Sequence, residues 1–235
     1  MNTNSSEGVI IITGANGNLG TVVTGQFLNN GYRVVATVMK ETEKNDLPAH
    51  ENLEVQVVNL ANEGEAADFI ASIIEKHGLV RAALMLVGGF AMGNIAGTPY
   101  ADIEKQLSLN FATAYHITRP LLSHMLDNQQ GRLVYIGSRP ALLPADGKNL
   151  VAYSLAKSLL FRLAEFINEE SRGRNVTATV VVPSTIDTVP NRKNMPKADP
   201  EKWVKPQQLA EILEFVCSEK ATAFRETVLK VYNNS

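Results

Sequence analysis

Residues 9–20 read VIIITGANGNLG and join a β-branched run to a glycine-rich turn. The run over residues 9–13 is typical of a strand buried on both faces of a parallel sheet. The turn opens directly into a helical pattern over residues 19–30. That pattern ends at Gly31, a residue suited to a left-handed C-cap. A strand, a glycine turn and a helix in this order are typical of the first unit of a nucleotide-binding sheet.

The glycines of this turn favour phosphate binding. Glycine allows a tight turn, close approach of the backbone to a pyrophosphate and close packing of helix on strand, while amide N–H groups and the helix dipole receive the negative charge. A glycine pattern can also form a plain turn, but its place between strand and helix favours the binding role. The cofactor-binding residues predicted here are Gly14, Asn16, Gly17, Asn18, Leu19 and Gly20.

Apolar runs and helical patterns alternate along the rest of the chain. Further strands are expected over residues 32–39, 53–58, 82–87, 132–138, 176–182 and 227–232, and helices over 63–77, 102–126, 150–170 and 205–218. This alternation predicts a single-domain α/β fold over residues 1–235, a Rossmann-type doubly wound parallel sheet of about seven strands with helices on both faces. Residues 184–206 are polar, contain four prolines and show no helical period, which predicts a loop or lid on the substrate side.

The end of the second expected strand bears on the choice of cofactor. NAD-binding sites usually place Asp or Glu there to bind the ribose 2′-hydroxyl. This chain has Val38 at about that position and Lys40 close behind, so no carboxylate at the strand end would repel a 2′-phosphate. We therefore expect NADP(H) to be favoured over NAD(H), although Lys40 could equally be a solvated lysine. Asn59 and Leu60, at the end of the third strand, are expected near the adenine.

A glycine pair and an asparagine between residues 88 and 110 are further candidate site residues. Gly88 and Gly89 follow the fourth expected strand, where a side chain would block approach to the cofactor; a plain tight turn is the alternative. Asn110 lies in the middle of the long helical pattern over residues 102–126. Asparagine is unfavourable there because its amide competes with backbone hydrogen bonds, so a functional reason is worth considering beside plain solvent exposure.

Residues 153–157 read YSLAK and place Tyr153 and Lys157 about one turn apart on the same side of an expected helix. A free tyrosine titrates near roughly pH 10, but a nearby cation favours the phenolate and lowers the pKa toward the range useful in proton transfer. This spacing alone often means a tyrosine beside a solvated lysine. Ser138 strengthens the functional interpretation because it ends the fifth strand, at the edge where open α/β sheets bind ligands.

Composition excludes several classes of protein. The hydrophobic content of 45%, charged content of 20% and net charge of -2 give no basic excess for binding nucleic acid. Cys217 is the only cysteine, which excludes an intramolecular disulfide and a cysteine-based metal cluster. The four histidines show neither HxxxH nor HExxH spacing, so no metal site is expected.

Two stretches of the sequence bear on the location of the protein: the start of the chain and its longest apolar run. Residues 1–8 are polar and lack a signal-peptide pattern, and the apolar run over residues 82–93 is shorter than the ~18 residues that span a bilayer. We therefore expect a cytoplasmic protein with no membrane partner. The single cysteine fits a reducing compartment.

The chain resembles the short-chain dehydrogenase/reductase family over nearly its whole length. The resemblance is carried by TGANGNLG (13–20), LSLNFATAY (107–115), VYIGS (134–138), YSLAK (153–157) and VVPSTIDT (181–188). It implies a catalytic set of Asn110, Ser138, Tyr153 and Lys157. It also implies cofactor contacts from Tyr153, Lys157, Pro183, Thr185 and Thr188. Gly88-Gly89 stands where the family usually has Asn-Ala-Gly, and Ser184 replaces a common glycine.

The family mechanism gives each residue a role. Tyr153 would donate a proton to a small carbonyl substrate, and Ser138 would hydrogen-bond the substrate oxygen. Lys157 would lower the pKa of Tyr153 and bind the nicotinamide ribose, while Asn110 would hold a water that relays protons. Thr188 would hold the nicotinamide carboxamide. The family also implies a homodimer or homotetramer formed through the two long helices expected over residues 102–126 and 150–170.

Two other functions stay open. Residues 87–94 (VGGFAMGN) and 182–203 resemble dihydropteridine reductases, a branch of the same family that reduces quinonoid dihydropterin. Those enzymes lack the serine and end the second strand in an aspartate suited to NADH, so Ser138 and the missing aspartate favour a carbonyl substrate and NADPH. A sensor that binds NADP without turnover is the third reading. The intact set of Ser138, Tyr153 and Lys157 argues against it, because a sensor needs no proton-transfer groups.

Overall fold

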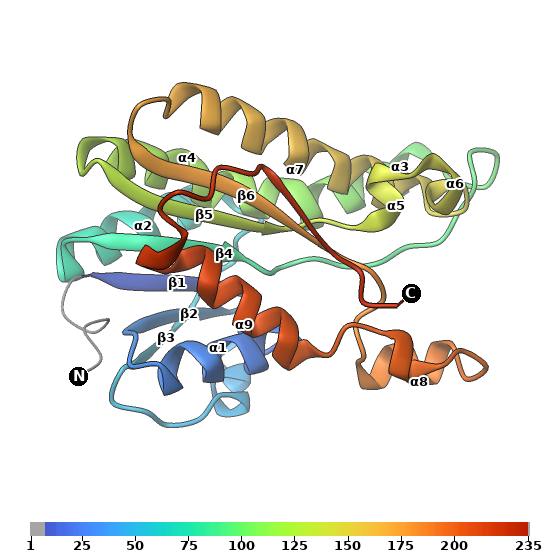
Figure 1. Ribbon diagram of the computed structural model, residues 1–235, viewed down its shortest axis with the longest axis horizontal. Helices are drawn as coiled ribbons and strands as arrows, with labels where there is room; N and C mark the ends of the chain where they lie inside the picture. The colour runs from blue at the N-terminus through green and yellow to red at the C-terminus, as the bar shows by residue number, and fades with distance from the viewer. Residues whose placement is uncertain (1–7, 235) are drawn as a thin grey trace.

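The computed structural model describes residues 8–234, and residues 1–7, which carry much of the expectation of no signal peptide, lie outside them. A seven-stranded sheet with the order β3-β2-β1-β4-β5-β6-β7 lies between two layers of helices (Figure 1). Every neighbouring pair of strands is parallel. The Rossmann-type, doubly wound α/β fold predicted from the alternation of strands and helices is confirmed.

The strands follow the apolar runs of the sequence. They are β1 Val9–Thr13, β2 Val34–Val38, β3 Leu53–Val57, β4 Val80–Met85, β5 Gln130–Ile136, β6 Asn175–Pro183 and β7 Val228–Val231. Every strand lies within two residues of its expected bounds, and β4 and β5 each begin and end two residues earlier than expected. Gly88 and Ser138 therefore lie in the loops beyond the carboxyl ends of these strands.

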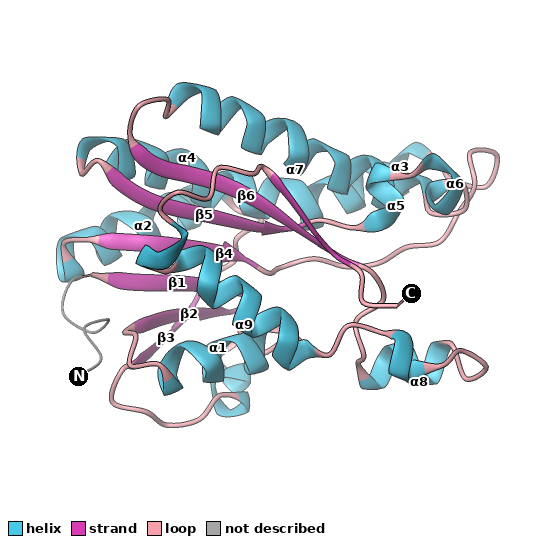
Figure 2. Cartoon of the chain, in the orientation of Figure 1, coloured by secondary structure: helices cyan, strands magenta, loops and turns pink. Residues whose placement is uncertain are grey.

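Helices cover both faces of the sheet (Figure 2). The helices are α1 Gly20–Asn29, α2 Glu63–His77, α3 Tyr100–Leu107, α4 Thr113–Asp127, α5 Arg139–Leu142, α6 Pro144–Gly147, α7 Val151–Glu170, α8 Val189–Asn194 and α9 Pro206–Cys217. One hydrophobic core joins α2, α4 and α7 to the sheet, and a second core joins α1 and α9 to the other face. Ile11 belongs to the first core and Ile10 and Ile12 to the second, because side chains alternate along a strand.

Two expected segments differ from the structure. The long helix expected over residues 102–126 is present over residues 100–127, but it contains a π-helical turn, η3 Ser108–Ala112, between α3 and α4. Such turns occur mostly as single insertions in helices, frequently at functional sites. The stretch 184–206 is also not free of helix, because it contains α8 and a short 3₁₀ turn, η4 Pro200–Lys202. Both helices are short and bury none of their residues, so no apolar period predicts them.

Candidate active site

The glycine turn leads from β1 into the N-terminus of α1. Gly14 has φ +62°, a conformation that favours glycine, and the Gly17 N–H donates to the Gly14 carbonyl at 3.0 Å. A Cβ on Gly20 would collide with the Gly14 carbonyl oxygen, so only glycine fits where α1 packs on the turn. The first turn of α1 has no acidic residue, and no side chain caps it. The positive end of its dipole therefore suits the phosphate groups of a dinucleotide, and the Thr21 and Val23 N–H groups there already donate to the Gly17 and Leu19 carbonyls.

The other predicted residues of the turn lie around this N-terminus. Asn18 is exposed and Leu19 is half-buried against the α1–α9 core. Asn16 Nδ2 lies 3.5 Å from Asp46 Oδ2, which links the turn to the 3₁₀ helix η2, Glu41–Asp46. Because η2 follows β2, the turn and the end of β2 border one region of the surface.

The end of β2 carries a carboxylate that the sequence analysis missed. Glu43 Oε2 accepts hydrogen bonds from the Met39 N–H at 2.9 Å and the Lys40 N–H at 3.1 Å. The view that no carboxylate lies at this strand end is therefore wrong. A local signal was available, because Glu43 lies three residues after Lys40, the residue that precedes η2, and Glu is common at this position of a helix start. Lys40 is exposed, whereas the Val38 side chain is buried in the core and can offer a ligand only its backbone.

The residues expected near the adenine differ in exposure. Asn59 is half-buried, and its Oδ1 accepts a hydrogen bond from the Ala61 N–H at 3.2 Å. Leu60 is 4% exposed and belongs to the hydrophobic core, so its side chain does not face a ligand. Its carbonyl oxygen lies 2.9 Å from His116 Nδ1.

Ser138, Tyr153 and Lys157 meet at the carboxyl edge of the sheet. Ser138 lies two residues beyond β5, and its buried Oγ makes no hydrogen bond to any residue that the structure describes. It nevertheless lies close enough to the Tyr153 hydroxyl to lower the pKa of that group, although the pair falls short of full hydrogen-bond geometry. Lys157, one turn further along α7, is buried, and its Nζ donates to the Ile136 carbonyl at 2.8 Å.

Burial controls the ionisation of both groups on α7. It raises the pKa of Tyr153, and the neighbouring Ser138 hydroxyl offsets only part of that rise. Burial also lowers the pKa of Lys157 to about 8. The expectation that Lys157 brings the pKa of Tyr153 below its ordinary value is therefore wrong for this structure. At neutral pH the phenol is protonated.

Asn110 belongs to the π-helical turn η3 and is almost wholly buried. Its Oδ1 accepts from the Gly89 N–H and its Nδ2 donates to the Gly89 carbonyl, each at 3.1 Å. Nδ2 also donates to Oε1 of Gln106 at 2.9 Å. The sequence analysis missed Gln106, and no local pattern distinguishes it from a surface residue of α3. The structure thus brings Asn110 to the Gly88–Gly89 loop rather than into direct hydrogen bonding with Ser138 or Tyr153.

An exposed aromatic residue packs against Tyr153. The ring of Phe90 packs edge-on against Tyr153 with 5.3 Å between centroids, and Phe90 remains 64% exposed. The loop that follows is held to the start of α7, since the Gly93 N–H donates to the Asn149 carbonyl at 2.8 Å and the Val151 N–H donates to the Gly93 carbonyl at 2.9 Å. Phe90, which the sequence analysis did not single out, therefore lies at the mouth of the site.

The two ends of the segment after β6 are hydrogen-bonded to each other. Pro183 ends β6, and the Thr185 carbonyl accepts from the Val204 N–H at 2.9 Å. Thr188 Oγ1 accepts from the Asn191 N–H at 3.3 Å and so caps α8. The predicted residue Thr188 thus begins the helix of the segment proposed as a lid.

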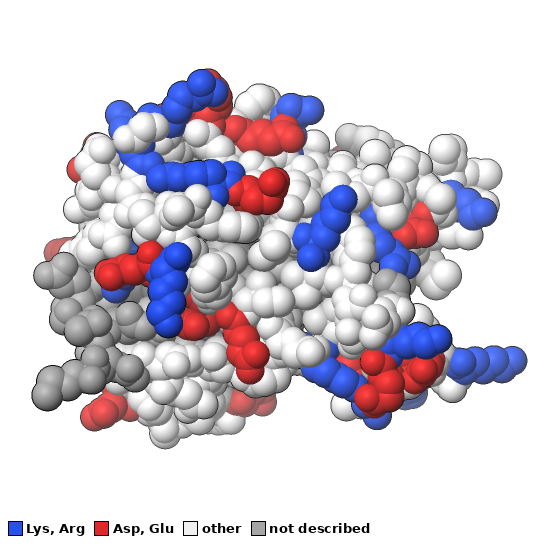
Figure 3. Space-filling model, viewed as in Figure 1, with Lys and Arg blue, Asp and Glu red and all other residues white. Residues whose placement is uncertain are grey.

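Asp187 is the centre of a charge cluster in this segment. It pairs with Arg192 through two contacts of 2.6 and 2.8 Å and with Lys205 at 3.0 Å. Arg192 and then Lys205 hold the pKa of the Asp187 carboxyl well below its ordinary value. Acidic and basic side chains gather over α8 and η4 in the space-filling view (Figure 3).

The sequence matches the short chain dehydrogenase family over residues 8–199. This chain belongs to that family. It is 26% identical to 2-(R)-hydroxypropyl-CoM dehydrogenase of Xanthobacter autotrophicus, with 77% of this chain and 75% of that protein covered. It is also 26% identical to acetoacetyl-CoA reductase of Acinetobacter sp., covering 76% and 74%. Among solved structures, ElxO with NADP bound has a TM-score of 0.90 at 20% identity, covering 96% of this chain and 97% of that one.

Members of the short chain dehydrogenase family are NAD(P)-dependent oxidoreductases, and this protein is therefore an oxidoreductase of that class. Within residues 8–234 no group of three or more His, Cys, Asp or Glu side chains is placed to hold a metal ion. No helix in the same range is long and apolar enough to cross a membrane.

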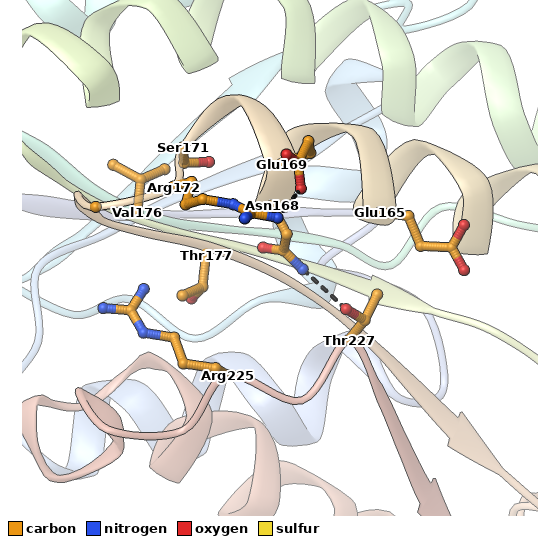
Figure 4. A pocket seen from close by; sticks show the side chains of 10 residues that line it. Glu165, Asn168, Glu169, Ser171, Arg172, Val176, Thr177, Arg225 and Thr227 are labelled. Carbon is orange, nitrogen blue, oxygen red and sulfur yellow. Dashed lines mark hydrogen bonds and ion pairs between the residues drawn. The ribbon is translucent and has the colours of Figure 1, made fainter.

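A hollow of about 500 Å³ lies at the opposite edge of the sheet, beside the start of β6 (Figure 4). It is lined by polar residues of α7 and by Thr177, Arg225 and Thr227, and it contains none of the predicted catalytic residues. The predicted residues Ser138, Tyr153 and Lys157 lie instead at the carboxyl edge of the sheet, beyond β5 and on α7.

Proposed function

We propose that this protein reduces the carbonyl group of a small molecule with NADPH and that Tyr153 donates the proton. One observation carries the proposal: the unpartnered, buried Ser138 hydroxyl lies beside the Tyr153 hydroxyl, with the Lys157 side chain one helical turn away. A buried hydroxyl left without a partner costs roughly 1–3 kcal/mol. A substrate oxygen that accepts from Ser138 would remove that cost.

The protonation of the site supports the direction of the reaction. Burial keeps Tyr153 neutral at pH 7, and a neutral phenol can act as a general acid toward an oxygen that gains negative charge. Ser138 stabilises the same developing charge by a second hydrogen bond. Lys157 places a positive charge near the phenolate that remains after proton transfer, and this attraction is strong because the lysine is buried.

NADP(H) is the cofactor we propose, in preference to NAD(H). The nicotinamide supplies the hydride. The glycine turn and the uncapped N-terminus of α1 fit the phosphates, and the exposed Lys40 offers a cation to a 2′-phosphate. The solved structure of ElxO contains NADP, which supports the same choice. Glu43 opposes it, because its carboxylate lies on the backbone N–H groups of Met39 and Lys40.

The preference is measured as the ratio of kcat/KM for NADPH to kcat/KM for NADH. We expect a ratio above one in the wild type. Glu43→Gln should raise it further, because the neutral amide removes a negative charge near the 2′-phosphate. A wild-type ratio below one would overturn the preference for NADP(H) and would leave the reductase proposal standing.

Tyr153→Phe tests the proton donor. The variant should lose at least about 10²-fold in kcat, since general acid catalysis typically contributes that much. NADPH should still bind with a dissociation constant within about twofold of the wild type. Tyr115→Phe is the matched control, because Tyr115 is exposed on α4 outside the site. Unchanged turnover in Tyr153→Phe would refute the catalytic assignment.

The acceptor is identified with a panel of ketones, aldehydes and quinonoid dihydropterin, each with NADPH and with NADH. Reduction of simple carbonyl compounds supports the proposal. Reduction of dihydropterin alone would favour the pterin reductase alternative, for which residues 87–94 and 182–203 are the motivating segments. NADPH binding without reduction of any acceptor would favour the sensor.

A further inference from the structure

The carboxamide of Asn110 is committed to the backbone of a neighbouring loop. It both donates to and accepts from Gly89, at 3.1 Å in each case, and thus pairs with that residue as a neighbouring strand would. Gly89 is 21 residues away in sequence. The contact therefore fixes the loop after β4 relative to the π-helical turn η3.

Gln106 reinforces the orientation of this carboxamide that the Gly89 pair sets. Asn110 Nδ2 has three acceptors: the Gly89 carbonyl, the Gln106 carbonyl at 3.3 Å and Gln106 Oε1 at 2.9 Å. In the flipped orientation, Oδ1 would face three acceptors and Nδ2 would face the Gly89 N–H. The two contacts from Gln106 make the flip unfavourable. Gln106 is 4% exposed and is the one buried residue within α3, all of which the structure describes.

At Gly88 the Asn110 carboxamide comes near the Lys157 side chain. A Cβ on Gly88 would lie 2.7 Å from Asn110 Oδ1 and 3.2 Å from Lys157 Nζ. Both atoms thus border the same small space, which is open because residue 88 has no side chain. The orientation of the Asn110 carboxamide decides whether an oxygen or an NH₂ group faces the Lys157 ammonium.

We infer that Gln106 is a positioning residue: through Asn110 it holds the Gly88–Gly89 backbone in place and keeps a carbonyl oxygen turned toward Lys157. This inference rests on the proposed function. Gln106 touches neither Tyr153 nor Ser138 by any hydrogen bond, so its effect on turnover passes through Asn110. An apolar residue of similar shape would fill the same space beneath α3 but would leave the carboxamide less constrained.

A double-mutant cycle on kcat tests the inference. The four proteins are the wild type, Gln106→Met, Asn110→Ala and the double variant. Each single substitution should lower kcat about tenfold, the size expected for loss of one orienting hydrogen bond. The double variant should be no slower than Asn110→Ala, because Gln106 has nothing left to orient. Losses that multiply in the double variant would overturn the inference, as would wild-type kcat in Gln106→Met.

A conservative variant separates positioning from folding. Gln106→Glu keeps an acceptor for Asn110 Nδ2 and should return kcat to within about threefold of the wild type. Lys105→Met is the control on the exposed side of α3 and should leave kcat unchanged. Thermal unfolding of each variant shows that it is folded at the assay temperature. If Gln106→Met does not fold, Gly88→Ala disturbs the same contact from the other side, and wild-type kcat there would also overturn the inference.

The inference and the proposed function fail in different ways. Turnover that survives Tyr153→Phe removes the proposed reaction itself. Loss of turnover in Tyr153→Phe together with wild-type kcat in Gln106→Met removes only the positioning role.

Discussion

At the scale of single residues, burial has a larger effect on the site than the spacing of Tyr153 and Lys157. The two side chains lie one turn apart on α7, yet desolvation raises the pKa of the tyrosine and lowers that of the lysine to about 8. The site therefore starts from a neutral phenol and an ammonium group that is easily deprotonated. The neutral phenol and the charged ammonium are the protonation states that the proposed carbonyl reduction requires.

The lowered pKa of Lys157 predicts a pH-dependent rate. The rate of carbonyl reduction should fall as the pH rises through about 8, because Lys157 loses the charge that stabilises the phenolate of Tyr153. The measurement is kcat/KM with NADPH over roughly pH 6 to 10. Lys157→Arg keeps a charge throughout this range and should move the fall to higher pH. A wild-type profile that stays flat through this range would contradict the role given to Lys157.

The same shift predicts a change in stability without cofactor. The ordinary pKa of 10.5 exceeds the value of about 8 in the folded protein, so between these values the unfolded chain binds more protons. The contribution of Lys157 to the free energy of unfolding therefore rises with pH across this window. Comparison with Lys157→Met isolates that contribution from other groups, such as Tyr135, whose pKa is raised by burial.

At the scale of secondary structure elements, the segment over residues 184–206 is attached through Asp187. This carboxylate pairs with Arg192 on α8 and with Lys205 just before α9, and so joins the two ends of the segment. We propose that the segment is a lid over the substrate and that Asp187 holds it in one position. A weaker attachment would leave the chemical groups intact while lowering the fraction of molecules with the lid in place.

Asp187→Asn should therefore raise KM for the carbonyl substrate several-fold, with a smaller effect on kcat. It should also make the chain easier to cleave by protease between residues 188 and 204. Asp199→Asn is the control, because Asp199 caps only η4. Unchanged KM and unchanged proteolysis in Asp187→Asn would exclude this role for the ion pairs.

The elements also show where sequence reasoning succeeds and where it stops. Buried parallel strands are continuous apolar runs, so the sheet was predictable. The π-helical turn η3 was not predictable, because Asn110 within it pairs with Gly89, 21 residues away, and no local pattern encodes that contact. Gln106 was missed for the same reason, because it acts through a hydrogen bond that depends on the folded backbone, whereas Glu43 had a local signal in its place at the start of η2. Tyr153, Ser138 and Lys157 were found because the family motif records their positions.

At the scale of the whole molecule, the outer faces of α4 and α7 expose apolar side chains. Leu155, Leu159 and Phe166 are 48%, 40% and 65% exposed on α7, and Tyr115 on α4 is 39% exposed. A groove between the two helices, of about 430 Å³, is lined by Tyr115, Leu122, Leu163 and Phe166 among others. Clustered apolar exposure of this kind often marks an interface between proteins.

The homodimer or homotetramer expected from the sequence should form through this groove. The groove lies between α7 and α4. A second copy related by a two-fold axis would bring the same apolar residues of both copies together. The first of the two expected long helices contains the π-helical turn η3, and the exposed apolar residues lie on α4 and α7, outside that turn. The interface therefore does not depend on the part of the helix that is interrupted.

Light scattering at micromolar concentration should give at least a dimer for the wild type. Phe166→Glu should shift the protein to a smaller species, because a carboxylate in the groove would be desolvated without a partner. Phe215→Glu is the matched control: Phe215 is 44% exposed, but α9 packs on the opposite face of the sheet. A monomeric wild type would refute the oligomer. Dissociation by Phe215→Glu with no effect of Phe166→Glu would instead place the interface on the α9 side, away from the groove between α4 and α7.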